Sequence, residues 1–127
     1  RYTYRVTTRF ARLAAGQTTF GGACAPPSNP TAAAFALCSA GDMSILTAAT
    51  GGTTIAATVP AVVVSHGKNT LGAYMMTGAQ IAGSAGDELE NANGDVNFVR
   101  SVNIDDQVIW IPANVLMSRM LAAGRLP

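Results

Sequence analysis

The sequence predicts a single α+β domain in which short strands are followed by a C-terminal helix. Three observations predict it. Side chains alternate in character at the N-terminus, three consecutive valines follow Pro60, and apolar residues recur at helical spacing near the C-terminus. At 127 residues the chain is long enough for one ordinary domain. We therefore expect residues 1–127 to form one unit.

The N-terminal segment RYTYRVTTRF predicts the first strand. Successive side chains of a strand point to opposite faces, so Tyr2, Tyr4 and Val6 fall on one side, with Thr and Arg on the other. The next segment, to about Ala34, is rich in Gly, Pro, Ala and Thr and predicts an irregular loop.

The central segments predict two strands separated by a turn. DMSILTA predicts a short strand, and the glycine pair 51–52 predicts the turn. TTIAATVPAVVVSH predicts a strand that Pro60 interrupts, at a sheet edge or a bulge. Because Val62, Val63 and Val64 form a continuous β-branched run, we expect this strand to be covered on both faces.

The second half of the chain predicts two further strands and a closing helix. The Gly- and Ala-rich stretch 67–94 is expected to hold one short helix, Thr77–Ala82. VNFVRSV alternates, and DDQVIWI is an apolar strand with Trp110 in the core. In PANVLMSRMLAAGRLP, Pro112 suits the first turn of a helix and Gly124 its end. Four apolar residues at helical spacing form its stripe: Val115, Leu116, Met120 and Leu121.

The composition favours an exported or polymerised protein. Hydrophobic residues make up 49% of the chain and charged residues 12%, so small polar residues must build much of its surface. A net charge of +1 argues against a nucleic-acid partner, because phosphate binding needs a clustered positive field. Four arginines recur near the N-terminus, and we interpret them as a solvated strand face and turn: Arg1, Arg5, Arg9 and Arg12.

The two cysteines, Cys24 and Cys38, bracket the Pro-rich stretch APPSNPTAAAFAL. A metal site usually needs four ligands, and the sequence has neither a CxxC pair nor a second histidine. We predict a disulfide between them, which contributes roughly 3 kcal/mol in the chain-entropy model and indicates a location outside the cytosol. The alternative is two buried free thiols.

The only histidine, His66, follows Ser65 at a strand end, where catalytic residues often lie. A nucleophile needs a base and an orienting acid within hydrogen-bonding reach, and the sequence has no G-x-S-x-G elbow. We therefore interpret His66 as a structural residue at the strand end, and we expect no enzyme activity.

The stretch GDELENANGD concentrates side-chain oxygens, which are the ligands that calcium prefers. Six residues supply them: Asp87, Glu88, Glu90, Asn91, Asn93 and Asp95. The stretch is not an EF-hand, and the alternative is a solvated acidic turn. Asp105 and Asp106 are interpreted as a turn before the Trp110 strand, because adjacent strand residues point to opposite faces and would not converge.

Three stretches together resemble the C-terminal part of type IV pilin-like proteins, which include pilins, minor pilins and type II secretion pseudopilins. They are VPAVVVSHGKN…GAY, DELENANGD…FV and DDQVIWIPANVLMSRMLAAGRLP. The resemblance spans 1–127 and is strongest from Val59 onward. It implies a head domain with an antiparallel sheet of about four to five strands and a C-terminal helix. In the family this sheet packs against a long N-terminal helix, which the sequence lacks, so that helix is either truncated or a separate chain.

The resemblance also implies a function. It indicates a non-catalytic structural subunit of a pilus or a secretion pseudopilus, in the periplasm or on the cell surface. Its partners would be other pilin or pseudopilin subunits and the N-terminal helix, in cis or in trans. Full-length subunits of the family are anchored in the inner membrane before assembly. Some pseudopilins hold calcium in a loop before the final strands, and Asp87–Asp95 is the acidic loop that corresponds.

Two rival functions stay open. A calcium-dependent extracellular binding module or adhesin tip would use the loop Gly67–Asp95, in which Tyr74 is the only aromatic residue. A small exported hydrolase is disfavoured, because no set of nucleophile, base and acid can be assembled. We also expect the head to expose an apolar stripe where the family's helix would pack. Its candidate residues are Tyr2, Tyr4, Val62 and Val64.

Overall fold

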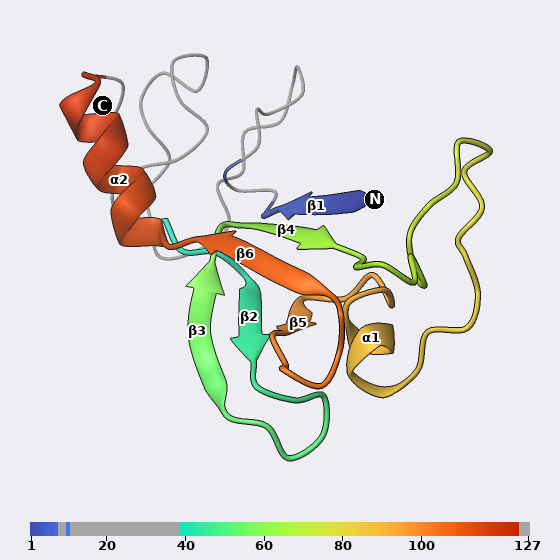
Figure 1. Ribbon diagram of the computed structural model, residues 1–127. Coiled ribbons are helices and arrows are strands. Elements are labelled where there is room, and N and C mark those ends of the chain that lie inside the picture. Colours follow the sequence, from blue (N-terminus) through green and yellow to red (C-terminus); the bar gives the residue numbers. More distant parts are fainter. Residues whose placement is uncertain (8–9, 11–38, 125–127) are drawn as a thin grey trace.

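Two three-stranded sheets form the core of the computed structural model, which describes residues 1–7, 10 and 39–124. The first sheet has the order β1-β4-β6, with β1 (Tyr2–Val6), β4 (Ala61–Ser65) and β6 (Gln107–Ile111) all antiparallel to their neighbours. Its register is regular along the whole of β4. Figure 1 shows these strands crossing over those of the second sheet.

The second sheet has the order β3-β2-β5, with β2 (Met43–Leu46), β3 (Thr54–Val59) and β5 (Asn97–Val99). β3 is antiparallel to β2, whereas β5 is parallel to it. The predicted α+β class is confirmed. Each sheet nevertheless has three strands, fewer than the four to five predicted for a single sheet.

Pro60 explains why the chain forms two sheets. It lies between β3 and β4, and its carbonyl accepts the Thr7 N–H at 2.8 Å. Proline has no N–H to continue a ladder, so one extended stretch becomes two strands in different sheets. The predicted interruption of this strand at Pro60 is therefore confirmed.

The core lies between the two sheets. Seven buried residues form it: Met43, Ile45, Val59, Val62, Val64, Phe98 and Val108. Trp110 packs against this core while partly buried, and the Arg100 guanidinium lies 5.7 Å from the centre of its ring. The predicted assignment of Trp110 to the core is thus confirmed in part.

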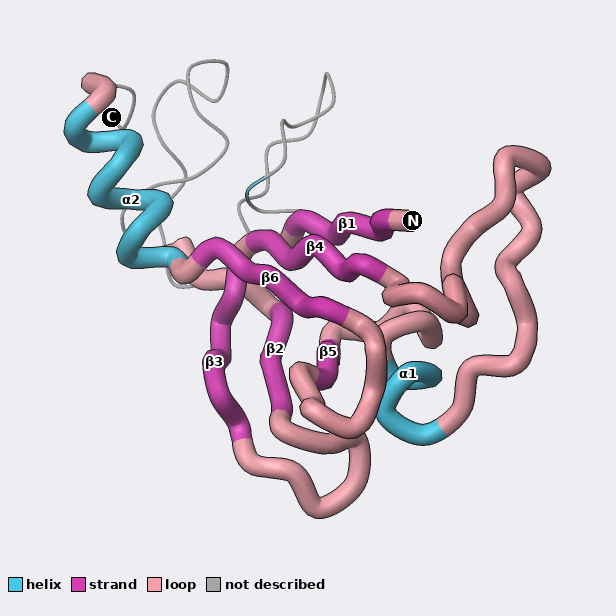
Figure 2. Tube along the Cα trace, viewed as in Figure 1, coloured by secondary structure: helices cyan, strands magenta, loops and turns pink. Residues whose placement is uncertain are grey.

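The two described helices are α1 (Gly86–Glu90) and α2 (Ala113–Ala122). α2 is the predicted closing helix, and Gly124 follows it with a φ of 62°. Its buried residue is Met117, whereas Val115 and Leu121 of the predicted stripe are about half exposed. Figure 2 shows α2 leaving the end of β6 and extending beyond the strands of the two sheets.

The predicted helix Thr77–Ala82 is wrong. The chain there folds back on itself in a hairpin-like loop, 72–82, where Met75 N–H bonds the Ala79 carbonyl at 2.8 Å. Gly78 lies at its tip with a φ of 82°, a value that ends helical geometry. A short helix forms instead in the acidic segment, as α1. Cys24 and Cys38, for which a disulfide is predicted, lie outside the described residues.

Candidate functional site

The six predicted calcium ligands in segment 86–95 face different partners. The Oδ1 atom of Asp87 accepts the Ala49 N–H at 2.8 Å, and Asn93 Nδ2 donates to Glu90 Oε2 at 3.1 Å. Asp95 Oδ1 accepts the N–H two residues further on at 2.7 Å. The Asp87 and Asp95 carboxylates therefore hold backbone N–H groups at different places, residues 49 and 97. Partial burial, followed by the negative charges of Asp95 and Asp87, raises the pKa of Glu90.

A different acidic cluster forms around α1. Glu88, Asp105 and Asp106 each offer a carboxylate oxygen, and these oxygens lie within 4.8 Å of one another. Within the described residues this is the group with the spacing of a cation site, and Glu88 is its one member from the predicted set. Three carboxylates at this spacing repel one another unless a proton or a cation intervenes.

The Asp105 carboxylate is held by the loop that follows β4. Its Oδ2 accepts the N–H of Asn69 at 2.9 Å and that of Lys68 at 2.7 Å. These two bonds, that from Asn69 first, lower the pKa of Asp105. Gly67 makes the approach feasible, because a Cβ there would lie 2.3 Å from the Asp105 Cγ. The Asn69 side chain extends the network, since its Nδ2 donates to Glu88 Oε1 at 2.7 Å.

Asp106 is the buried member of the cluster. Only 5% of its surface is exposed, its Oδ2 accepts a bond from Asn91 Nδ2 at 3.1 Å, and its Oδ1 has no protein partner. Burial raises the pKa of Asp106. The bond from Asn91 and the nearby His66 oppose this rise, and the charges of Glu88 and Asp105 add to it. A buried carboxylate oxygen without a partner is costly, so a cation or a proton at this place would stabilise the fold.

Sequence reasoning missed this cluster because it applied the alternation of a strand to Asp105 and Asp106, although it placed them in a turn. The prediction that they do not converge is wrong. They lie in the bend before β6, which begins at Gln107, and a bend does not impose the alternation of a strand. Their interpretation as a turn before the Trp110 strand is confirmed.

His66 lies directly after β4 and is buried, with 1% of its surface exposed. Its backbone N–H donates to the Arg1 carbonyl at 2.9 Å, and its Nε2 is hydrogen-bonded to the Thr3 hydroxyl. His66 thus ties the start of β1 to the end of β4. Ser65 pairs with Tyr2 and lies on the face of β4 that points away from the core. Because neighbouring residues alternate, the side chains of Ser65 and His66 point to opposite sides of the sheet.

The face of the first sheet that points away from the core is apolar, and we call it the outer face. Its rows cross all three strands in register, with Tyr4, Val63 and Ile109 forming the central row. Tyr2 and Tyr4 are each about 80% exposed, and Ile109 is 66% exposed. Six exposed apolar residues lie on this face, and Ser65 and Gln107 are its polar members in the row of Tyr2. The six are Tyr2, Tyr4, Val6, Val63, Ile109 and Ile111.

The predicted apolar stripe is therefore correct in two of its residues and wrong in two. Tyr2 and Tyr4 lie on the outer face, whereas Val62 and Val64 are buried between the sheets. Val63 takes their place, because alternation sends it to the side opposite its neighbours. For the same reason the expectation that β4 is covered on both faces is wrong within the described residues.

Comparisons with protein-family models, with curated proteins and with solved structures found no match to this chain. In the part of the chain that the structure describes, neither helix has the length and apolar character needed to cross a membrane.

Proposed function

We propose that this domain is a non-catalytic structural subunit, the head of a type IV pilin-like protein in a pilus or a secretion pseudopilus. The proposal rests on the outer face together with the resemblance of the sequence. In this family a long helix packs against the head's sheet, and subunits polymerise through that helix. The partners are then other pilin or pseudopilin subunits, and the location is the periplasm or the cell surface.

The outer face carries the argument. The exposed side of this sheet presents two tyrosines and four aliphatic residues. Removing this apolar surface from water would contribute a favourable free energy of binding. Contiguous exposed apolar patches usually mark a partner surface. A helix laid along the central row Tyr4, Val63 and Ile109 would bury that patch without changing the sheet.

The arrangement of Ser65 and His66 favours a structural interpretation over hydrolysis. A serine nucleophile needs its base within hydrogen-bonding distance, and strand alternation directs these two side chains to opposite sides. The ring of His66 is engaged by Thr3.

We also propose calcium as a structural ion, at Glu88, Asp105 and Asp106 instead of along segment 86–95. Calcium accepts six to eight oxygen ligands, so backbone carbonyls and water would complete the shell around these three carboxylates. The ion would fix α1 against the start of β6, and it has no part in chemistry.

Filament incorporation tests the proposed function. In cells that make the whole protein, Ile109→Lys should lower the amount of subunit in sheared filaments by at least about tenfold. Burying an unpaired charge costs well over the ~1.4 kcal/mol that a tenfold change represents. The matched control is Ile55→Lys, which alters a half-exposed isoleucine of β3 in the other sheet. Normal incorporation of Ile109→Lys, with normal folding, would contradict the proposal.

A further inference from the structure

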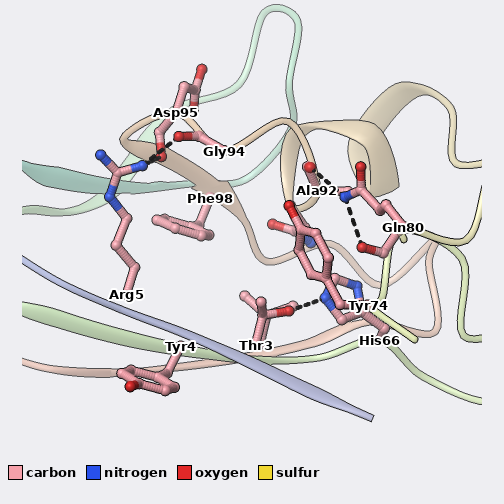
Figure 3. A pocket seen from close by; sticks show the side chains of 13 residues that line it. Thr3, Tyr4, Arg5, His66, Tyr74, Gln80, Ala92, Gly94, Asp95 and Phe98 are labelled. Carbon is pink, nitrogen blue, oxygen red and sulfur yellow. Dashed lines mark hydrogen bonds between the residues drawn. The ribbon is translucent and has the colours of Figure 1, made fainter. Parts of the chain in front are cut away.

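A pocket of about 310 Å³ opens beside β1, and one of its lining residues, Asn91, bonds Asp106 of the acidic cluster. Its walls are the core-facing side of β1, the hairpin-like loop 72–82 and the segment that follows α1. Figure 3 shows Arg5 and Asp95 toward one end of the pocket, His66, Tyr74 and Gln80 toward the other, and Phe98 between them. A volume of this size suits a small ligand.

Hydrogen bonds fix the walls of this pocket. Gln80 Nε2 donates to the Gly72 carbonyl at 2.8 Å and to the Ala92 carbonyl at 2.7 Å, which ties the loop to the segment after α1. At the other end the Arg5 guanidinium donates to the carbonyls of residues 94 and 95. Such a pocket is already formed before a ligand arrives, so binding orders few side chains.

One buried polar atom in the pocket lacks a partner. The His66 ring bonds Thr3 through Nε2, whereas its Nδ1 has no protein partner. Gly72 lies beside this atom, and a Cβ on it would lie 2.4 Å from the Ala92 Cβ and 3.5 Å from Nδ1. Buried polar side-chain atoms are almost always hydrogen-bonded, so Nδ1 marks a place for a polar ligand group.

The remaining lining combines apolar surface with balanced charge. Phe98 and Val64 supply apolar side chains, and Tyr74 is 53% exposed. Among the lining residues, Arg5 and Asp95 carry the charges, and these are opposite in sign. The pocket therefore favours a neutral molecule with an apolar face and several hydrogen-bonding groups.

We propose that this pocket binds one neutral sugar unit, such as the end of a glycan chain. A hydroxyl both donates and accepts, so it satisfies His66 Nδ1 in either tautomer of the ring. The C–H face of a sugar ring packs on an aromatic side chain, and Tyr74 offers one at the pocket. Tyr4 belongs both to the lining of the pocket and to the outer face, but this binding site does not depend on the proposed function.

NMR titration of the folded chain with methyl glycosides of glucose, galactose, mannose and N-acetylglucosamine tests this proposal. At least one sugar should bind with a Kd on the order of 1 mM, which corresponds to ~4 kcal/mol. Its addition should shift the amide signals of Gly72, Ala92 and Gly94, which line the pocket.

Variants of two exposed tyrosines distinguish binding in the pocket from nonspecific binding elsewhere on the surface. Tyr74→Ala should weaken binding by about tenfold through lost ring contact, and Tyr74→Phe should retain it. Tyr2→Ala, on the outer face, should leave the affinity unchanged. The proposal is overturned if no sugar shifts these signals, if Tyr74→Ala binds as well as the wild type, or if methyl glucuronide binds more tightly than every neutral sugar.

Discussion

At the scale of single residues, Asn91 shows how one buried amide joins distant segments. It follows α1 directly, its Oδ1 accepts the Val99 N–H at 2.7 Å, and its Nδ2 donates to the Val99 carbonyl at 3.0 Å. The same Nδ2 reaches Asp106. The sequence suggested Asn91 as a calcium ligand, whereas the structure gives its side chain three protein contacts.

Asn91→Ala should therefore lower the free energy of unfolding by about 2–4 kcal/mol. It leaves buried polar groups of Val99 and Asp106 unpaired, and each such group costs about 1–3 kcal/mol, less whatever water can recover. Urea denaturation measures the change. The control is Asn93→Ala, an exposed asparagine two residues away that should cost under about 1 kcal/mol. Equal losses in the two variants would show that the buried network contributes little.

At the scale of the element, β4 has two unlike faces although its sequence is uniform. Val62 and Val64 are 1% exposed, and Val63 between them is 41% exposed. A run of three valines is compatible with a strand buried on both sides, and local sequence offers no means of choosing. The choice depends on what the rest of the chain brings to each face.

The same isosteric change at neighbouring positions of β4 tests this asymmetry. Val64→Thr should destabilise the domain by about 1–3 kcal/mol, because it buries a hydroxyl among apolar side chains. Val63→Thr should change stability by less than about 0.5 kcal/mol, because its hydroxyl faces water. Chemical denaturation of the isolated domain gives both values. A large loss for Val63→Thr would mean that the outer face is covered within this chain.

At the scale of the whole molecule, the acidic cluster brings together residues that are far apart in sequence. Glu88 comes from α1, Asp105 and Asp106 from the bend before β6, and the loop after β4 supplies the N–H groups that hold Asp105. The cluster thus exists only when α1, the bend before β6 and the loop after β4 have come together. A cation bound there would stabilise the folded state alone.

Calcium should consequently raise the melting temperature of the domain relative to chelator. Binding at a hundredfold excess over Kd contributes about 2.7 kcal/mol, which corresponds to several degrees for a domain of this size. Asp106→Asn should abolish the shift while keeping an oxygen that can accept the bond from Asn91. Asp95→Asn should retain the shift, because Asp95 lies outside the cluster. Equal melting temperatures of the wild type in calcium and in chelator would exclude a calcium site.

Local patterns were enough to predict the strands around Tyr4, Ile45 and Trp110 and the helix around Met117, because periodicity and turn residues are local signals. They also located the interruption at Pro60, because proline has no N–H to donate to a strand ladder in any fold.

Three features could not be predicted without the folded structure: which sheet each strand joins, which side of β4 is buried, and which carboxylates lie close together. Pairing between strands, burial and the approach of like charges all depend on segments distant in sequence. The spacing of residues along one segment does not report these contacts. The acidic cluster therefore takes Glu88 from segment 86–95, the stretch richest in potential ligands, and its other two members from elsewhere.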